Sequence, residues 1–431
     1  MSEKILFTQE DIEQGYYPLR PFQKWLIDRH FNKVKTTMMN IGFLLKLNPQ
    51  IDVDKLAESV NTMLKRHDVF RTRLVFHPQK NELCQRFDGE IFPVVVENWS
   101  DEEFESFKKF LAEPFLIIDK PLYRFYIFKT PSANYFFIDI YHAILDGTAT
   151  AILIGHELSM IYKGKIFKSD PVNYADYIAA EMSLAPEIFE SAKNYWKNLL
   201  KNFGDEKHLP PPDISEKPTW KKNKFEYDFK NITKKFFHDS GLKETNFFMA
   251  VSMIAISKLA KSKKMLMTWV HNGRINPKES RLIGLMIEQL PIAWDFSQDI
   301  TVEKFLQGVD TELVEGLKNI KGLDFVYDGY YEDGCATFIF QKKNYLVPDK
   351  PMICGVPSEV LELKSNFWSA AQNTLDIEIV LLDDGNYFLE LSYDSGNYSE
   401  DAMKNFAEVI DKIILKMQDK NILVSEVLGE D

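Results

Sequence analysis

The sequence predicts an α/β protein in which helices pack on layered sheets. Segments that alternate between apolar and polar residues, as strands do, recur between segments with helical spacing, and both halves of the chain contain both kinds. A length of 431 residues exceeds one ordinary hydrophobic core, so we expect two domains, residues 1–170 and residues 171–431. The composition, 45% hydrophobic and 13% aromatic residues, is sufficient for two packed cores.

Helices and strands alternate in the first half of the chain. Pro21 suits the first turn of a helix, where its missing amide hydrogen costs nothing. Asp52 caps the next helix, in which Leu56, Val60 and Met63 share one face. At residues 66–74 the spacing of the apolar residues changes from the helical period towards the period of two that strands have. Strands are predicted at residues 38–47, 83–87, 94–96, 123–128 and 136–140.

The second half contains the same kinds of segment. A helical pattern covers residues 174–200, with a break near Pro186, and the proline-rich residues 210–213 are typical of a surface loop. Ser399 caps the last helix. Further helices are predicted at residues 245–263 and from residue 301, strands at residues 265–270, 336–340 and 375–381, and a β-hairpin at residues 378–393.

Charge, cysteine content and hydropathy exclude several classes of protein. The net charge of −12 argues against a nucleic-acid binder, which needs a basic face. Cys84, Cys335 and Cys354 are too few and too scattered for a disulfide framework or a metal site. No window reaches the 18 apolar residues that a membrane span requires, and the N-terminus has no secretion signal. We therefore expect a soluble protein of the reducing cytoplasm that works without a membrane.

One stretch holds the candidate chemistry. The apolar residues 136–141 lead into His142, which begins the pattern HxxxDG with Asp146 and Gly147. A side chain between the end of a strand and the start of a helix stands clear of the core while the backbone holds it in place. We expect His142 to accept a proton at neutral pH and the Gly147 amide to bind a developing oxyanion. A helix is predicted to follow, with Ile152, Leu153, His156, Met160 and Ile161 at helical spacing and Gly164 at its end.

His142 and Asp146 could also have purely structural roles. His142 could be a structural histidine at a strand end, and Asp146 suits a structural role better than a chemical one, as a helix cap or the partner of an arginine. We expect His67 to be structural, since it lies inside a helix-to-strand motif, and His156 to lie on a helix face near apolar residues. Neither has metal-ligand spacing to His142. The chain has no G-x-S-x-G motif and no cysteine in a nucleophile motif, which favours group transfer over hydrolysis.

Five segments, in order, resemble the motifs of nonribosomal-peptide condensation domains, and the resemblance covers nearly the whole chain. Residues 17–23 (YPLRPFQ) are similar to YPLSPAQ, residues 66–74 (RHDVFRTRL) to RHExLRTxF, and residues 141–147 (YHAILDG) to the signature HHxxxDG. Residues 174–177 with residues 195–196 are similar to YxDYAxW…YW, and residues 283–291 (IGLMIEQLP) to IGxFVNTLP.

The resemblance implies two chloramphenicol-acetyltransferase-like lobes that form a V-shaped pseudo-dimer, with His142 in the channel between them. A thioester on the phosphopantetheine of an acyl or peptidyl carrier protein would meet an amine acceptor there, and the protein would need no cofactor of its own. The resemblance suggests Arg71 as the partner of Asp146, with Arg66 and Arg73 as alternatives. No adenylation or carrier domain is present, so we expect a free-standing monomer.

The chain departs from the family pattern at two places. Tyr141 replaces the first histidine of the signature, and we expect it to pack or orient the loop. Glu288 and Gln289 replace an Asn-Thr pair near the implied substrate channel. Three functions therefore stay open: an amide-forming acyltransferase, an acyltransferase of the same fold that uses an alcohol acceptor or a coenzyme A donor, and a catalytically silent module that binds a carrier protein.

Overall fold

The computed structural model describes residues 7–32, 35–165, 167, 169–203, 208–327, 335–342, 351–363 and 373–429. The chain divides into two compact units. The first contains Met1–Leu184, Asn272–Ile287 and Tyr345–Trp368, and the second contains Ala185–His271, Glu288–Asn344 and Ser369–Asp431. This division differs from the expected one, because the first unit extends past residue 170 to Leu184 and two later segments also belong to it. The first four residues, on which the absence of a secretion signal was judged, lie outside the described residues.

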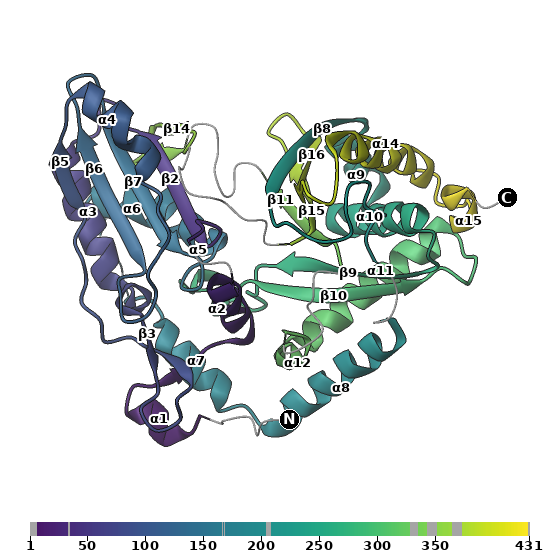
Figure 1. The fold of residues 1–431 in the computed structure, drawn as a ribbon, viewed down its shortest axis with the longest axis horizontal. Helices are drawn as coiled ribbons and strands as arrows, with labels where there is room; N and C mark the ends of the chain where they lie inside the picture. Colours follow the sequence, from purple (N-terminus) through teal and green to yellow (C-terminus); the bar gives the residue numbers. More distant parts are fainter. Residues whose placement is uncertain are drawn as a thin grey trace. The chain divides into compact units, whose positions relative to one another are not determined.

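A mixed sheet forms the centre of the first unit. Its described strands follow the order β14-β2-β7-β6-β5 (Figure 1). β7 (Asn134–Tyr141) pairs antiparallel with β2 (Asn40–Lys46) and β6 (Tyr123–Lys129), and β5 (Val95–Asn98) runs parallel to β6. β14 (Glu359–Leu361) joins β2 from a distant part of the chain. The central position of β7 explains its continuous apolar run, since a central strand is covered on both faces.

Helices cover both faces of this sheet. α3 (Val53–Arg66) and α6 (Leu158–Tyr162) contact each other behind it in Figure 1, and α4 (Asp101–Phe107) crosses its front. Phe104 of α4 is buried against aromatic residues of β6 and β7. The remaining elements of the first unit are α1 (Gln9–Glu13), β1 (Tyr17–Pro18), α2 (Pro21–Asn32), η1 (Asp68–Arg71), β3 (Arg73–Phe76), β4 (Leu83–Arg86), η2 (Lys108–Phe110), α5 (Gly147–Thr150), η3 (Ala151–Glu157), α7 (Tyr174–Met182), η4 (Glu279–Arg281), β12 (Met352–Ile353) and β13 (Val356–Pro357).

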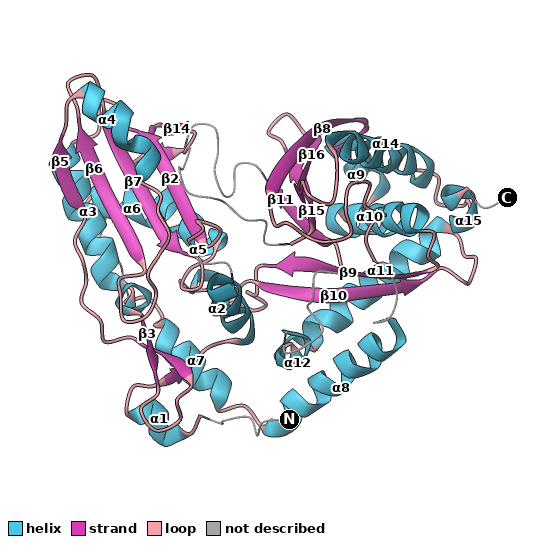
Figure 2. Cartoon of the chain, viewed as in Figure 1, coloured by secondary structure: helices cyan, strands magenta, loops and turns pink. Residues whose placement is uncertain are grey.

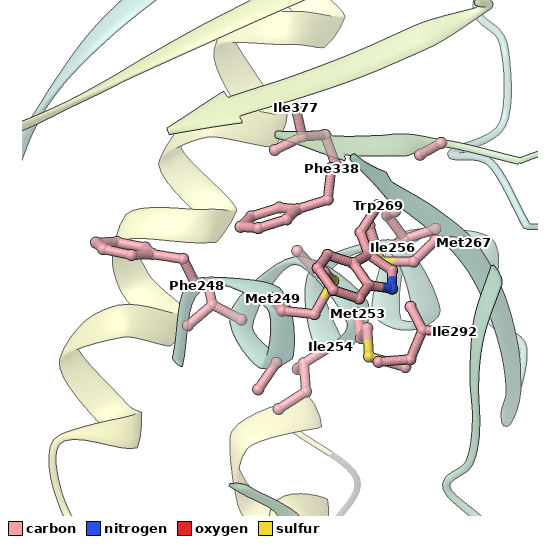
Figure 3. Packing of buried hydrophobic residues seen from close by; sticks show 14 of the residues in the cluster. Phe248, Met249, Met253, Ile254, Ile256, Met267, Trp269, Ile292, Phe338 and Ile377 are labelled. Carbon is pink, nitrogen blue, oxygen red and sulfur yellow. The ribbon is translucent and has the colours of Figure 1, made fainter. Parts of the chain in front are cut away.

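The second unit is built on a sheet whose described strands follow the order β10-β9-β11-β15-β16-β8. α10 (Glu244–Ala260) lies against this sheet, and Figure 3 shows its apolar side chains beside Met267 and Trp269 of β9 (Lys264–His271). The remaining elements are α8 (Pro186–Phe203), β8 (Lys222–Thr233), α9 (Lys234–Ser240), β10 (Glu288–Asp295), α11 (Val302–Lys318), η5 (Ile320–Gly322), α12 (Asp324–Tyr327), β11 (Thr337–Lys342), β15 (Leu375–Leu381), β16 (Asn386–Asp394), α14 (Glu400–Met417) and α15 (Val424–Leu428).

The α/β fold class is confirmed, since each unit is a sheet with helices on it (Figure 2). The hairpin of β15 and β16 and the caps of α3 and α14 lie where the sequence predicts them. The long strands β8 and β10 were missed, as were the short strands β1, β12, β13 and β14. The helix predicted after Gly147 contains a π-helical stretch, Ala151–Glu157, which side-chain spacing does not distinguish from an α-helix. Across the described part of the chain, none of the helices combines the length and apolar character of a membrane span.

Candidate functional site

The loop between β7 and α5 carries His142. Its backbone is held at two points, because the His142 amide donates to the Met39 carbonyl at 2.8 Å and the Ile144 amide donates to the Tyr141 carbonyl at 3.0 Å. The first of these bonds continues the pairing of β7 with β2, and the second closes a tight turn. The local sequence thus ends a strand, turns once and starts a helix at Gly147.

The imidazole of His142 is half-buried and held in one tautomer. Its Nδ1 lies 3.1 Å from the carbonyl oxygen of Leu145, and a carbonyl only accepts hydrogen bonds, so Nδ1 carries the hydrogen. Nε2 therefore holds a lone pair, and no group in the described part of the chain hydrogen-bonds to it. Burial lowers the pKa of His142, against a smaller opposing effect of Asp146. The ring is thus neutral at pH 7 and suited to accept a proton at Nε2.

The Gly147 amide is a free donor at the start of α5. As the first helical residue, Gly147 has no carbonyl one turn earlier in the helix, and among the described residues none accepts its hydrogen. Gly147 is half-buried, so the amide belongs to a partly exposed helix start. Such an amide can bind a negative charge that develops on a substrate oxygen.

Asp146 holds the loop to a distant segment of the chain. Its carboxylate is fully buried and accepts from the Ala149 amide at 2.8 Å, which caps α5. Its second oxygen accepts from the Met286 amide at 2.7 Å and the Ile287 amide at 3.3 Å. The carboxylate thus caps a helix and binds a distant segment, as a structural role requires.

The charged partner of Asp146 is Arg274, not Arg71. Nη1 of Arg274 lies 2.8 Å from Oδ2 of Asp146, and the Arg274 side chain is only 3% exposed. Arg71 instead donates to the Lys65 carbonyl at 3.1 Å. The two alternatives are also wrong, since Arg66 pairs with Glu157, and Arg73 pairs with Asp88 and Asp119.

Arg274 also holds its own loop closed. Nη1 donates to the Asn272 carbonyl at 2.9 Å, and Nη2 donates to the Leu282 carbonyl at 2.9 Å. Gly273 has φ +67°, and a Cβ there would lie 1.6 Å from the Met286 carbonyl oxygen. Sequence reasoning missed Arg274, although the Asn272-Gly273 pair beside it marks a turn in which only glycine fits.

Tyr141 packs as an aromatic residue beneath the loop. Its ring is fully buried and lies edge-on to His30, with ring centroids 5.4 Å apart, and near Phe115 at 5.7 Å. Its hydroxyl finds no hydrogen-bond partner among the described residues. Burial strongly raises the pKa of Tyr141. Tyr141 therefore has the contacts of a packing residue and not those of an acid or base.

The segment around His67 makes structural contacts. His67 is buried and shares the Glu157 carboxylate with Arg66, at 3.0 Å and 2.9 Å. The Asp68 carboxylate accepts from the Tyr174 and Ala175 amides, each at 2.9 Å, and so caps α7. These contacts connect α3, η3 and α7, as a structural role requires.

Glu288 and Gln289 belong to the second unit, and both side chains are 3% exposed. The Tyr327 hydroxyl lies 3.2 Å from Oε2 of Glu288, and Nε2 of Gln289 donates to Oγ1 of Thr337 at 3.3 Å. They start β10, which is an edge strand in the described part of its sheet. Their place on a substrate path stays a prediction.

Nucleophilic and metal chemistry find no support among the described residues. Burial raises the pKa of Cys84 to about 11 and those of Cys335 and Cys354 to about 12, so each is a thiol at neutral pH. No three histidine, cysteine, aspartate or glutamate side chains of the described residues gather as metal ligands would. None of the three cysteines therefore has the depressed pKa of an activated nucleophile.

Comparison with known proteins identifies the family of the chain. A family model for the condensation domain matches residues 13–421. The chain is 23% identical to tyrocidine synthase 3 of Brevibacillus parabrevis over 307 residues, and 24% identical to surfactin synthase subunit 2 of Bacillus subtilis over 323 residues. These matches cover 68% and 71% of the chain but only 5% and 9% of those much longer proteins.

Solved structures share the fold at low sequence identity. The condensation domain of the monacolin K polyketide synthase MokA has a TM-score of 0.76 at 16% identity, covering 95% of this chain and 99% of that one. The teicoplanin X-domain in complex with OxyB has a TM-score of 0.77 at 14% identity, covering 99% and 97%. The starter condensation domain of rhizomide synthetase, as an RzmA mutant with C8-CoA, has a TM-score of 0.74 at 11% identity, covering 96% and 98%. The chain therefore belongs to the condensation domain family.

Proposed function

We propose that the chain is a condensation-type acyltransferase. It would transfer an acyl or peptidyl group from the phosphopantetheine thioester of a carrier protein to an amine, forming an amide. The observation that carries this proposal is the state of His142, whose Nδ1 donates to the Leu145 carbonyl while Nε2 keeps a lone pair in a half-buried position. Membership in the condensation domain family and the similarity to two peptide synthases support the same reaction class.

His142 accepts one proton and later returns it in this reaction. The amine nitrogen attacks the thioester carbonyl, forms the new C–N bond and gives a proton to Nε2 of His142. The tetrahedral intermediate then breaks the C–S bond, and the departing thiolate takes the proton back. Because a thioester is already activated, orientation of the two reactants supplies several kcal/mol and the base about 10²–10⁴-fold.

The Gly147 amide is the proposed oxyanion donor. The carbonyl oxygen of the thioester gains negative charge in the intermediate, and the unused N–H at the start of α5 can donate to it. Asp146 holds the loop in the geometry that this step needs. Glu288 and Gln289 remain proposed substrate-path residues of the second unit.

Two specific observations favour alternatives. The similar RzmA mutant structure contains C8-CoA, which supports a coenzyme A donor as the second candidate reaction. Transfer to an alcohol, forming an ester, is the other form of this candidate. The similar X-domain is in complex with OxyB, and Tyr141 departs from the family signature, so a catalytically silent module that recruits a partner is the third candidate.

One experiment separates these functions. The purified chain is incubated with acyl-loaded carrier proteins or acyl-coenzyme A, and with panels of amines and alcohols, and the products are identified by mass spectrometry. An amide formed only from carrier-bound thioesters supports the proposal, and formation from coenzyme A or to an ester supports the second candidate. If no donor and acceptor pair reacts while a carrier protein still binds, the chain is a recruitment module.

A further inference from the structure

A fully buried pair of amide side chains lies beneath the His142 loop. Gln23 of α2 and Gln85 of β4 are each 0% exposed. Nε2 of Gln23 donates to Oε1 of Gln85 at 2.9 Å, and Nε2 of Gln85 donates to Oε1 of Gln23 at 3.1 Å. The second hydrogen of Gln85 goes to the Pro18 carbonyl at 2.8 Å. Buried side-chain amides are usually hydrogen-bonded, because a buried polar group without a partner is costly.

Only Gln23 of this pair reaches the loop. Its Nε2 donates to the Ala143 carbonyl at 2.9 Å, and its Oε1 also accepts from the Arg20 amide at 3.1 Å. Ala143 is the residue directly after His142, inside the turn that the Ile144 amide closes on the Tyr141 carbonyl. The bond from Gln23 therefore fixes the peptide plane between Ala143 and Ile144.

That peptide plane decides where the next carbonyls point. If it rotates, the Leu145 carbonyl, 3.1 Å from Nδ1 of His142, moves away from the ring. The hydrogen on Nδ1 then loses its acceptor, and the other tautomer, with the hydrogen on Nε2, becomes competitive. A histidine in that tautomer cannot accept a proton at Nε2.

The same start of α2 also holds the segment opposite the loop. Nη1 of Arg20 donates to the Leu285 carbonyl at 2.9 Å, and the Tyr174 hydroxyl donates to the same oxygen at 2.7 Å. Leu285 precedes Met286, whose amide binds Asp146. Both ends of the His142–Asp146 loop are thus tied to residues 20–23.

We propose that Gln23 is a positioning residue for His142, which sets the tautomer of the imidazole through the Ala143 carbonyl. This proposal rests on the proposed function for its effect on catalysis, although its effect on the ring can be measured without any reaction. Gln23 touches neither substrate nor the reacting atoms, and acts only through the loop backbone.

The pair supplies its own matched control. Gln23→Glu and Gln85→Glu each place one carboxylate in the same buried pair, so both variants lose thermal stability for the same reason. Only Gln23→Glu removes the donor to the Ala143 carbonyl. Imidazole NMR of histidine-labelled full-length protein, with His142 assigned from the spectrum of His142→Ala, reports its tautomer and pH titration. Kinetics with the substrates found for the wild type report kcat and KM.

Gln23→Glu should shift the His142 tautomer towards hydrogen on Nε2 and lower kcat by about 100-fold with little change in KM, while Gln85→Glu keeps both wild-type values. Identical His142 signals in wild type and Gln23→Glu, or equal changes in both variants, would overturn the proposal. If the carboxylate variants do not fold, Gln23→Met and Gln85→Met make the same comparison. If no substrate reacts with the wild type, the proposed function fails, and the NMR comparison still decides the role of Gln23.

Discussion

Nη1 of Arg274 lies 2.8 Å from Oδ2 of Asp146, and 128 residues separate the two in the chain. Both side chains are almost completely buried, at 3% and 0% exposure. The pair ties the segment after β9 to the loop that carries His142. The same carboxylate also accepts from the Ala149 amide nearby and from the distant Met286 and Ile287 amides. The geometry of the loop therefore depends on contacts with residues far away in the sequence.

Removing the positive charge of this pair should cost much more stability than removing Arg71. Arg274→Met leaves a buried carboxylate without its counter-charge, which typically costs about 3–5 kcal/mol. Arg71→Met removes one hydrogen bond to the Lys65 carbonyl, worth about 1 kcal/mol. Denaturant unfolding of both variants measures the difference. Equal losses would contradict the assignment of Arg274 as the partner of Asp146.

His142→Ala should abolish transfer without unfolding the protein. Among the described residues the side chain hydrogen-bonds only to the Leu145 carbonyl, so the melting temperature should change by only a few degrees, while turnover falls by about 10²–10⁴-fold. His156→Ala removes an exposed histidine of η3 and serves as the control, with unchanged turnover. Wild-type turnover in His142→Ala would rule out His142 as the base.

The rate of transfer should decrease at acidic pH, with a midpoint below the ordinary histidine pKa of 6.5. Burial lowers the pKa of His142 below its ordinary value of 6.5, so the neutral ring persists to lower pH than a free imidazole would. As pH falls through the lowered pKa, Nε2 becomes protonated and kcat/KM decreases. A profile of kcat/KM with midpoint below 6.5, absent in the residual activity of His142→Ala, is the expected result. A midpoint above 6.5 would contradict it.

Two tyrosine-to-phenylalanine changes should have opposite signs. Tyr141→Phe removes a buried hydroxyl without a partner among the described residues, so the free energy of unfolding should rise by about 1 kcal/mol. Tyr174→Phe removes a 2.7 Å hydrogen bond to the Leu285 carbonyl and should lower it by about 1 kcal/mol. Thermal or urea unfolding compares the two. A loss in Tyr141→Phe would show that its hydroxyl has a partner, such as a bound water.

Glu378 in β15 should make the protein less stable as pH rises. Burial, and next the negative charge of Glu390, raise the pKa of Glu378 to about 7. Between the unfolded value of 4.5 and about 7, the folded state holds a proton that the unfolded state has released, so stability decreases as pH increases through this window. The effect is on the order of 1–3 kcal/mol.

The difference between wild type and Glu378→Gln isolates this group from all other titrations. Glu378→Gln keeps an acceptor for the Gln341 amide and has no charge to bury, so its relative stability should increase from pH 5 to pH 8. Glu226→Gln, an exposed position on β8, two strands away in the same sheet, is the control and should leave the slope unchanged. A constant difference between pH 5 and 8 would show that Glu378 titrates normally.

Local pattern was enough for much of the fold. The strands and helices on either side of His142 follow from an apolar run and a capping residue, since Asp146 begins a helix by satisfying an amide three residues away. The resemblance of five motifs led to the condensation domain family, which the family model confirms. β8 was missed although its apolar residues, Phe225, Tyr227 and Phe229, alternate with polar and charged ones, which is the pattern of a strand with one exposed face.

The sequence by itself determined the α/β class, the family and the position of His142, because these depend on residue types within a few positions of one another. Only the tertiary structure decided that Arg274 binds Asp146, that β14 joins the first unit and that Gln23 holds the Ala143 carbonyl. Those contacts join residues far apart in the chain. Such pairings are chosen by the burial of whole segments, which the spacing of residues along a sequence does not record.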